Sequence, residues 1–320
     1  MTEFLRKNKL AAAGLFIVAA LTMAALFAPW LAPYDPADQK LMDRLQGPSW
    51  KHPFGNDELG RDILSRILWG ARVSMRVGAT VVLLSGLAGV LIGGFAGYVG
   101  GKLDTLVTVV VINSLLAFPG VLFAIALVAF LGQGLDRLIF ALTTIGWVGY
   151  ARLARGQVLK VKTLEFVESA RALGASSMRI FAGHILPNIV QPVLVQASVG
   201  MAIAILSEAS LSFLGLGIAP PTPSWGAMLN DVRNHLFDAP HMVVFPSVTL
   251  ALTVLSFNFL GDALRDWLTP NFPSGASLKH PIGVFDHAVT SCARRAARAS
   301  RGRGQSRRSR SEPRHFPGRH

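Results

Sequence analysis

The hydrophobic residues of this chain gather in long runs, and the polar residues are concentrated between them. A helix needs about 20 predominantly apolar residues to cross a bilayer. Five runs reach that length, over residues 11–32, 77–99, 105–131, 193–217 and 243–264, and a shorter, more polar run covers 135–151. When the last run is counted as a span, the pattern predicts an all-α membrane protein built as a six-span helical bundle.

The first run follows Arg6, Lys7 and Lys9, as the apolar core of a signal peptide would. It is longer than the roughly 7–15 residues of such a core, and further candidate spans follow it. We therefore predict an uncleaved first span. Basic residues near the span ends are almost balanced between the two sides of the membrane, so they do not decide the orientation.

The composition agrees with a membrane protein, because 51% of the residues are hydrophobic and only 15% are charged, against about 25% in soluble domains. Much of the net charge of +13 lies in one place, since residues 271–320 hold 11 Lys or Arg and 2 Asp or Glu. The low-complexity basic segment 273–320 has too few aliphatic residues to bury a core and is expected to be disordered. It is either a tail that binds anionic lipid or an accidental extension of the protein, and the intact mass of the native chain distinguishes the two.

Residue patterns of the common enzyme classes are missing from the sequence. The single cysteine, Cys292, excludes a disulfide framework and cysteine-based metal sites. Gly101-Lys102 resembles part of a phosphate-binding loop, but Ala96 and Leu103 stand where that loop needs Gly and Ser or Thr. We expect no catalytic residue, cofactor, metal ion or nucleic-acid partner. Energy for uphill transport must then come from an ion gradient or from a partner protein.

Small residues and one proline mark special positions within the spans. Gly89, Gly93, Gly97 and Gly101 recur every four residues, which places them on one helix face where another backbone can approach closely. The alternative is a glycine-rich helix near a loop. Pro119–Gly120 falls midway through the third span and is expected to kink it.

Glu208 and Asn258 are the polar side chains within the spans that bear most on function. A carboxylate in a hydrophobic helix is costly, so such residues are functional candidates by default. Both residues are candidates for the translocation path, and the alternative for Glu208 is a structural hydrogen bond between helices.

The polar segment 152–191, between the fourth and fifth spans, carries the most informative pattern. It predicts a short amphipathic helix with Phe166, Ala170 and Leu173 on one side, then a glycine break and a second helix ending near Pro187. A helix lying on the membrane surface would give the same amphipathic pattern.

The spacing within this segment resembles the EAA loop of ABC-importer permeases, which reads EAA-x3-G-x9-I-x-L-P. Glu168, Ser169 and Ala170 take the leading positions, Gly174 the glycine position, and Leu186-Pro187 the end. Ser169 replaces an alanine, and His184 stands at the isoleucine position.

The resemblance extends over about residues 1–272 and is closest to the dipeptide/oligopeptide (and nickel) branch of these permeases. The further matching segments are His52–Asp62, Ser65-Arg66, Gly70–Arg72, Ser210–Gly217, Pro220–Gly226 and Asn258–Asp266. The resemblance implies residues 1–76 as the N-terminal span with an extracytoplasmic segment, and 77–272 as the permease core with its EAA loop at 152–191.

The family resemblance implies a mechanism and a set of partners. An extracytoplasmic binding protein delivers substrate to two similar permease subunits in the lipid bilayer, and two ATPase subunits dock on their cytoplasmic loops. Residues 165–174, beginning at Glu165, correspond to the coupling helix, with Glu168 as the docking carboxylate and Gly174 as the joint. The loop and both termini are then cytoplasmic, in the plasma (inner) membrane of a bacterium.

The outer segments 33–76 and 218–242 either meet the binding protein or, in the charged stretch 57–72, form a helix along the membrane surface. The function that the resemblance favours is non-enzymatic import of di- or oligopeptides. The same machinery carrying nickel, glutathione or another small solute is the first alternative. An ion-driven secondary transporter is the second, and a structural membrane scaffold the third.

Overall fold

The computed structural model describes residues 9–268, and this part of the chain is helical apart from loops and one isolated β-bridge between Asn56 and Asp62. The predicted basic tail at 273–320 lies outside the described residues, as do Arg6, Lys7 and Cys292.

Helices account for nearly all of the regular structure. Before the EAA segment they are α2 (Lys9–Leu26), α3 (Ala28–Leu31), the 3-10 turn η1 (Leu41–Asp43), α4 (Ile63–Val99), α5 (Gly101–Thr105), the π-helical η2 (Leu106–Ile112), α6 (Asn113–Leu116), α7 (Gly120–Leu131) and α8 (Leu135–Val161). After it begins they are α9 (Glu165–Ala172), α10 (Ser177–Ile180), the π-helical η3 (Phe181–Ile185), α11 (Leu186–Phe213), α12 (Trp225–Asp231) and α13 (His241–Leu268).

Four of the described helices are long and apolar enough to cross a membrane, or five if the bent pair within residues 101–131 is one span. The molecule is therefore an all-helical membrane protein with four or five candidate spans. The predicted run 135–151 corresponds to α8, which has 27 residues but is not apolar enough to count among these candidate spans. Arg152 and Arg155, together with Thr, Gly and Tyr residues, interrupt its apolar positions.

The second span is longer than the sequence pattern indicates. The predicted run 77–99 is the later part of α4, a single helix of 37 residues that begins at Ile63. Asp62 caps it, with a carboxylate oxygen that accepts from the Ser65 backbone N–H at 2.8 Å. Residues 63–72 of the charged stretch 57–72 therefore belong to α4 and do not form a separate surface helix.

The predicted kink at Pro119 is confirmed. The helical stretches Gly101–Leu116 and Gly120–Leu131 are bent by 80° at the break between them. Proline has no backbone N–H and forces the residue before it away from helical geometry, so the first stretch ends here and Pro119 caps α7.

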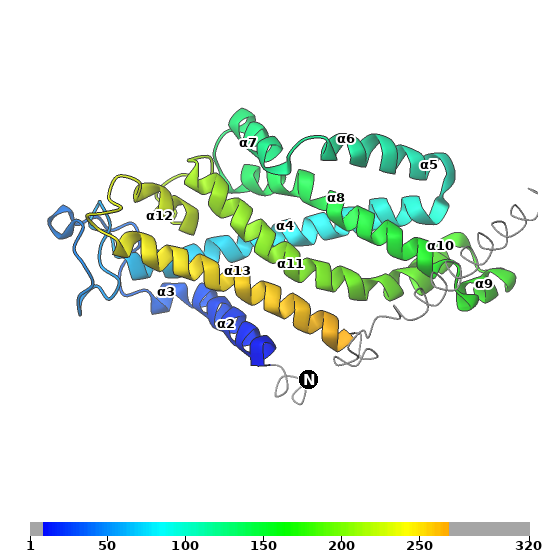
Figure 1. Ribbon diagram of the computed structural model, residues 1–320, viewed down its shortest axis with the longest axis horizontal. Helices are drawn as coiled ribbons and strands as arrows, with labels where there is room; N and C mark the ends of the chain where they lie inside the picture. Colours follow the sequence, from blue (N-terminus) through cyan, green and yellow to red (C-terminus); the bar gives the residue numbers. More distant parts are fainter. Residues whose placement is uncertain (1–8, 269–320) are drawn as a thin grey trace, which may run out of the picture. The chain divides into compact units, whose positions relative to one another are not determined.

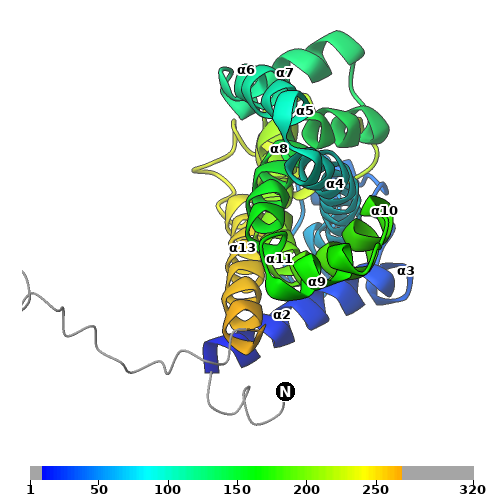
Figure 2. The same cartoon turned by 90° about the vertical axis from the view of Figure 1, so that its right-hand side faces the viewer.

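The long helices α4, α8, α11 and α13 lie side by side, with α4 in contact with α2, α8 and α11 (Figure 1). Seen end-on, residues 101–131 lie on the α8 side of this layer, whereas α2 lies next to α13 (Figure 2). The apolar core at one end of the helices is centred on Trp225, which is fully buried among side chains of α4, α11 and α13. This arrangement places the α9–α10 segment at one end of α8 and α12 at the other end of α11 (Figure 1).

Candidate functional site

The EAA-like segment folds as a short helix, a left-handed joint and the start of a longer helix. α9 ends at Ala172, and Gly174 follows with φ of +80°, a conformation that side-chain-bearing residues adopt only with strain. The Ala175 N–H donates to the Ala170 carbonyl at 3.1 Å and closes the turn. Gly174 therefore sets the angle between α9 and α10.

Val167 anchors α9 to the bundle. It is fully buried in a cluster with Val158 of α8, Ile180 of α10 and Ile189 of α11. The predicted apolar face is only partly correct, because Ala170 packs against this cluster whereas Phe166 is 42% and Leu173 88% exposed. The buried face of α9 is the one that meets α8 and the residues that follow the joint and fold back onto α9.

The outward side of this segment combines apolar and acidic groups. Phe166 and Leu173 are exposed beside Glu165 and Glu168, and Ser169 is exposed as well. Within the described residues neither glutamate takes part in a salt bridge. The segment thus presents apolar surface and unpaired carboxylates on a rigidly supported helix.

The second helix of the loop does not end near Pro187, contrary to the expectation from sequence. Residues 177–213 form one continuous helical stretch, and Leu186 and Pro187 lie in the first turn of α11. The preceding turn, η3, is π-helical, so Pro187 stands beside an irregular turn of this stretch, where the regular i→i−4 hydrogen-bond pattern is already interrupted. Pro187 therefore does not break the helix.

Two basic side chains tie the end of α8, just before α9, to the corner between α4 and α5. Arg155 donates to both carboxylate oxygens of Asp104, at 2.5 and 2.7 Å. The Lys162 ammonium donates to the Gly97 carbonyl at 3.0 Å. These contacts fix the position of α8 at the point where the EAA-like segment begins.

The glycine stripe lies against α8 over three of its four predicted positions. A Cβ placed on Gly93 would lie 2.2 Å from the carbonyl oxygen of Ala151, and one on Gly89 would lie 2.6 Å from that of Trp147. At Gly97 the nearest atom would be Cγ of Arg155, at 3.1 Å. We call this contact the glycine seam (Gly89, Gly93 and Gly97 against α8). Gly101 is not part of it, because α4 ends at Val99 and Gly101 has open space around it.

Glu208 lies fully buried between α4 and α11. Its carboxylate oxygens accept hydrogen bonds from Ser74 at 3.0 Å and from Ser212 at 2.8 Å. Asn258 is half-buried in α13 and donates to the Val254 carbonyl one turn earlier, at 2.9 Å. Glu208 and Asn258 therefore share no hydrogen-bond partner. The bond from Ser74 to Glu208 links α4 to α11, whereas the bond made by Asn258 stays within α13.

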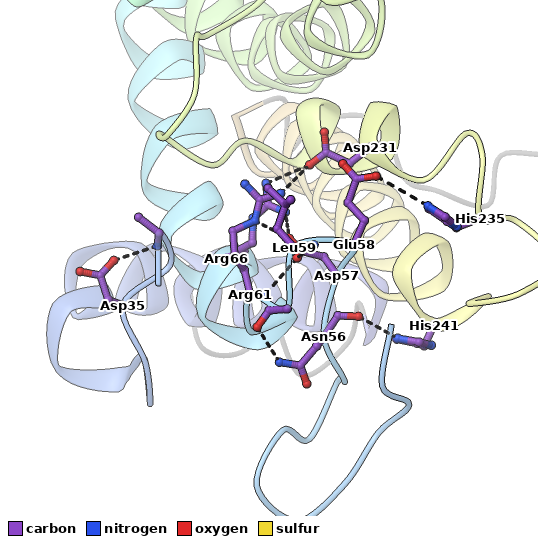
Figure 3. A network of polar contacts seen from close by, with 12 residues as sticks. Asp35, Asn56, Asp57, Glu58, Leu59, Arg61, Arg66, Asp231, His235 and His241 are labelled. Carbon is purple, nitrogen blue, oxygen red and sulfur yellow. Dashed lines mark hydrogen bonds and ion pairs between the residues drawn. The ribbon is translucent and has the colours of Figure 1, made fainter. Parts of the chain in front are cut away.

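A buried ionic network at the α12 end was not identified from the sequence (Figure 3). One oxygen of Asp57 accepts from Arg61 Nε at 2.6 Å and from Arg66, and one oxygen of Asp231 accepts from the same two guanidinium groups at 3.1 and 3.2 Å. The sequence signal for it is the density of charges just before α4, but the partner on α12 is distant in the chain.

Further contacts join the same two outer segments. His235 lies 3.7 Å from the Glu58 carboxylate, and the His241 ring lies 3.2 Å from the Asn56 carbonyl (Figure 3). The indole N–H of Trp225 donates to the Ile67 carbonyl at 3.1 Å. The segments before α4 and around α12 therefore form one packed unit.

Over residues 9–268, no group of three or more His, Cys, Asp or Glu side chains is placed to hold a metal ion.

Comparison with known proteins assigns a family to this architecture. Residues 89–272 match the family described as binding-protein-dependent transport system inner membrane component, and residues 3–48 match the N-terminal TM domain of oligopeptide transport permease C. The chain is 48% identical to the glutathione transport system permease protein GsiD of Escherichia coli O157:H7 over 84% of its own length and 88% of the relative. The same values hold for GsiD of Shigella sonnei, and GsiD of Shigella dysenteriae serotype 1 is 47% identical over the same shares.

Proposed function

The chain belongs to the family of binding-protein-dependent ABC-importer inner membrane permeases, and from this premise we propose that it conducts a small peptide-like solute of the glutathione type into the cell. A permease of this family works with a separate ATPase subunit, which hydrolyses the ATP. This membership argues against the ion-driven transporter and the structural scaffold considered from the sequence.

The choice of cargo rests on the relatives. The sequence pattern favours di- or oligopeptides, with glutathione as an alternative, and three relatives at 47–48% identity are named for glutathione transport. Glutathione is itself a short peptide, so both proposals require a path for a polar solute with amide groups. Other di- and oligopeptides remain the second candidate, because residues 3–48 match a family named for oligopeptide transport.

The proposed partner surface for the ATPase is α9 with its joint. Phe166 and Leu173 provide exposed apolar area, and Glu168 provides a carboxylate that is free to pair with a basic group. Val167 holds the helix against α8 and α11, so a force on α9 is passed to the spans instead of being absorbed by a loose loop. A second permease subunit and two ATPase subunits complete the proposed assembly.

The proposed topology counts six membrane crossings, with α8 and the bent stretch 101–131 each as one. The bent stretch starts at the α9 end, where Asp104 pairs with Arg155, and it leads to the α12 end, where the Gly134 N–H donates to the Gly217 carbonyl at 3.3 Å. At about 1.5 Å per residue α8 is about 40 Å long, enough to cross a bilayer. With six crossings α9 and both termini share one side of the membrane, and the proposed docking of the ATPases on α9 makes that side cytoplasmic.

The outer unit, formed by the segments before α4 and around α12, is proposed to receive the binding protein. The ionic network of Asp57, Arg61, Arg66 and Asp231 holds its two parts together. Exchange of both parts together with those of a sister permease should transfer binding-protein preference, whereas exchange of one part should disrupt the network and the fold.

Affinity purification of the chain from its native membrane in mild detergent is the first test, because it identifies the ATPases, the second permease and the binding protein. ATP-dependent uptake of radiolabelled glutathione and of dipeptides by the assembled complex in proteoliposomes then tests the cargo. Uptake of dipeptides without glutathione would overturn the glutathione proposal. Purification of the chain alone, in conditions that preserve a known ABC complex, would overturn the proposed partners.

Substitution at the joint tests coupling. Gly174→Leu places a β-carbon on a backbone with φ of +80° and should abolish uptake while the protein still inserts into the membrane. Gly183→Leu is the matched control, because Gly183 lies in the same loop with ordinary φ and open space around it. Normal uptake by Gly174→Leu would remove α9 and its joint as the coupling element.

A further inference from the structure

A pocket of about 530 Å³ lies where α4 ends, between this helix and the chain around the joint, and α10 lies on the α4 side of the bundle, away from α13 (Figure 2). Three aromatic rings form its apolar wall. The rings of Phe95 and Phe181 meet edge to face with their centroids 6.1 Å apart, and the ring of Tyr98 lies 5.6 Å from that of Phe181. The opposite wall carries polar groups, because Arg171 of α9 and Ser177 of α10 also line the pocket. The pocket is therefore amphipathic.

The polar wall selects for a negative charge. Of the described residues that line the pocket, only Arg171 is charged, and its side chain is exposed. Within residues 9–268 it takes part in no salt bridge, and the acidic residues of its own helix, Glu165 and Glu168, do not line the pocket. A guanidinium group matches the geometry of a phosphate, and the exposed hydroxyl of Ser177 is a further donor. An anion in this pocket would therefore meet an accessible cation and no lining carboxylate.

The apolar wall continues into a stripe on the surface of α4. Leu87, Leu91, Phe95 and Val99 recur every four residues along this candidate membrane span, and they are 43–57% exposed. Phe95 lies two residues from Gly93, which is about 200° around the helix, so the stripe faces away from the glycine seam and α8. From Leu87 to Val99 the stripe is about 18 Å long at 1.5 Å per residue. One leaflet of the hydrocarbon core is about 15 Å thick, so the stripe can line an acyl chain of a single leaflet.

We propose that this pocket binds an anionic phospholipid, with the phosphate on Arg171 and an acyl chain along the α4 stripe. The depth in the membrane fits, because α4 ends at Val99 and headgroups begin where a span leaves the hydrocarbon core. Tyr98 agrees with this depth, since aromatic residues concentrate at membrane interfaces. In the proposed topology this is the cytoplasmic leaflet. The bound lipid would join the end of α4 to the α9–α10 segment, whatever the cargo of the permease is.

The main test is photo-crosslinking in the complete complex of this permease with its partner permease and ATPases. Met178, which lines the pocket and is 64% exposed, is replaced by p-benzoylphenylalanine. The complex is placed in nanodiscs that hold phosphatidylcholine in excess over phosphatidylglycerol, and mass spectrometry identifies the crosslinked products. Phosphatidylglycerol adducts should exceed the share of this lipid in the nanodisc about fivefold, the preference expected for one basic residue near an anionic lipid surface.

Two substitutions in the pocket should remove this enrichment. Arg171→Gln removes the cation, and Ser177→Glu places a carboxylate where the phosphate would lie. The second change is at an exposed site in the first turn of α10, where an acidic side chain is compatible with the helix, so the variant should fold. Arg179→Gln is the matched control, because Arg179 is exposed in the same helix but does not line the pocket. It removes the same charge and should keep the full enrichment.

Three outcomes overturn the lipid site and leave the proposed import function standing. Adducts of the two lipids in proportion to their shares, or an enrichment that Arg171→Gln does not change, would show that the pocket does not select an anionic headgroup. Crosslinks to an ATPase subunit in place of lipid would assign the pocket to the docking surface. Crosslinks to the second permease would assign the α4 stripe to the contact between the two permeases.

Discussion

The glycine seam between α4 and α8 makes Gly93→Ala the most informative single substitution. The new methyl group would lie 2.2 Å from the Ala151 carbonyl oxygen and 2.5 Å from its Cα. Ordinary contacts are 3.4–4 Å, so the two helices must separate locally by about 1 Å. The opposing atoms belong to the backbone, and no side-chain rotation can relieve the overlap. Overpacking of this kind typically costs about 1–3 kcal/mol of stability.

Gly94→Ala is the matched control for this substitution. It changes the neighbouring residue of the same helix, and its Cβ would lie 3.5 Å from Phe181, an ordinary contact. Both substitutions remove the same backbone freedom of glycine, which by itself favours the helix by up to about 1 kcal/mol. The difference between the two variants therefore isolates the steric term at the seam.

The assay is thermal unfolding of the purified complex in detergent, followed by size-exclusion chromatography of the heated samples. Gly93→Ala should melt at a lower temperature than the unsubstituted complex, and Gly94→Ala at the same or a higher temperature. Equal melting temperatures for the two variants would refute the close backbone contact between α4 and α8.

Three other sets of substitutions test contacts that support the site. Asp104→Arg should lower uptake per ATP hydrolysed, and Arg155→Asp added to it should restore part of that ratio, as measured in proteoliposomes. Trp225→Phe removes the buried indole N–H and should destabilise the complex by about 1–3 kcal/mol in thermal melts, since one buried hydrogen bond is lost and the smaller ring leaves a cavity. Asp57→Asn should destabilise by about 3–5 kcal/mol and Asp231→Asn by less, because their side chains are 2% and 28% exposed; melting curves in the reverse order would contradict the network.

Features that depend on neighbouring residues in the chain were predictable from the sequence. Long apolar runs locate the helices, Pro119 locates the bend, and the four-residue spacing of Gly89, Gly93 and Gly97 indicates a face for close packing. In each case the physical cause is local: the length of an apolar stretch, a missing N–H or a missing side chain. The joint at Gly174 belongs to the same class, because a left-handed turn selects glycine directly.

Features that depend on distant partners were not predictable. The charged stretch 57–72 indicated contact with the binding protein or a helix along the membrane surface, yet Arg66 is buried and pairs with Asp57 and, far along the chain, with Asp231. The buried face of α9 is another example, since Val167 is covered by Ile180 and Ile189 only once the chain has turned back at Gly174. Periodicity within α9 favours Phe166 and Leu173 equally well, and tertiary packing decides against them.

The same helix, α8, connects the coupling segment to the glycine seam. Its end leads into α9 and carries Arg155. Its later half lies against the glycine seam. Because backbone touches backbone at Gly93, a shift of α8 relative to α4 must be small or must move both helices together. A displacement of α9 would therefore be passed to α4 as a rigid movement. Loosening of the seam by Gly93→Ala should accordingly lower uptake per ATP hydrolysed at temperatures where the complex is still folded, and an unchanged ratio would mean that the seam does not transmit the motion.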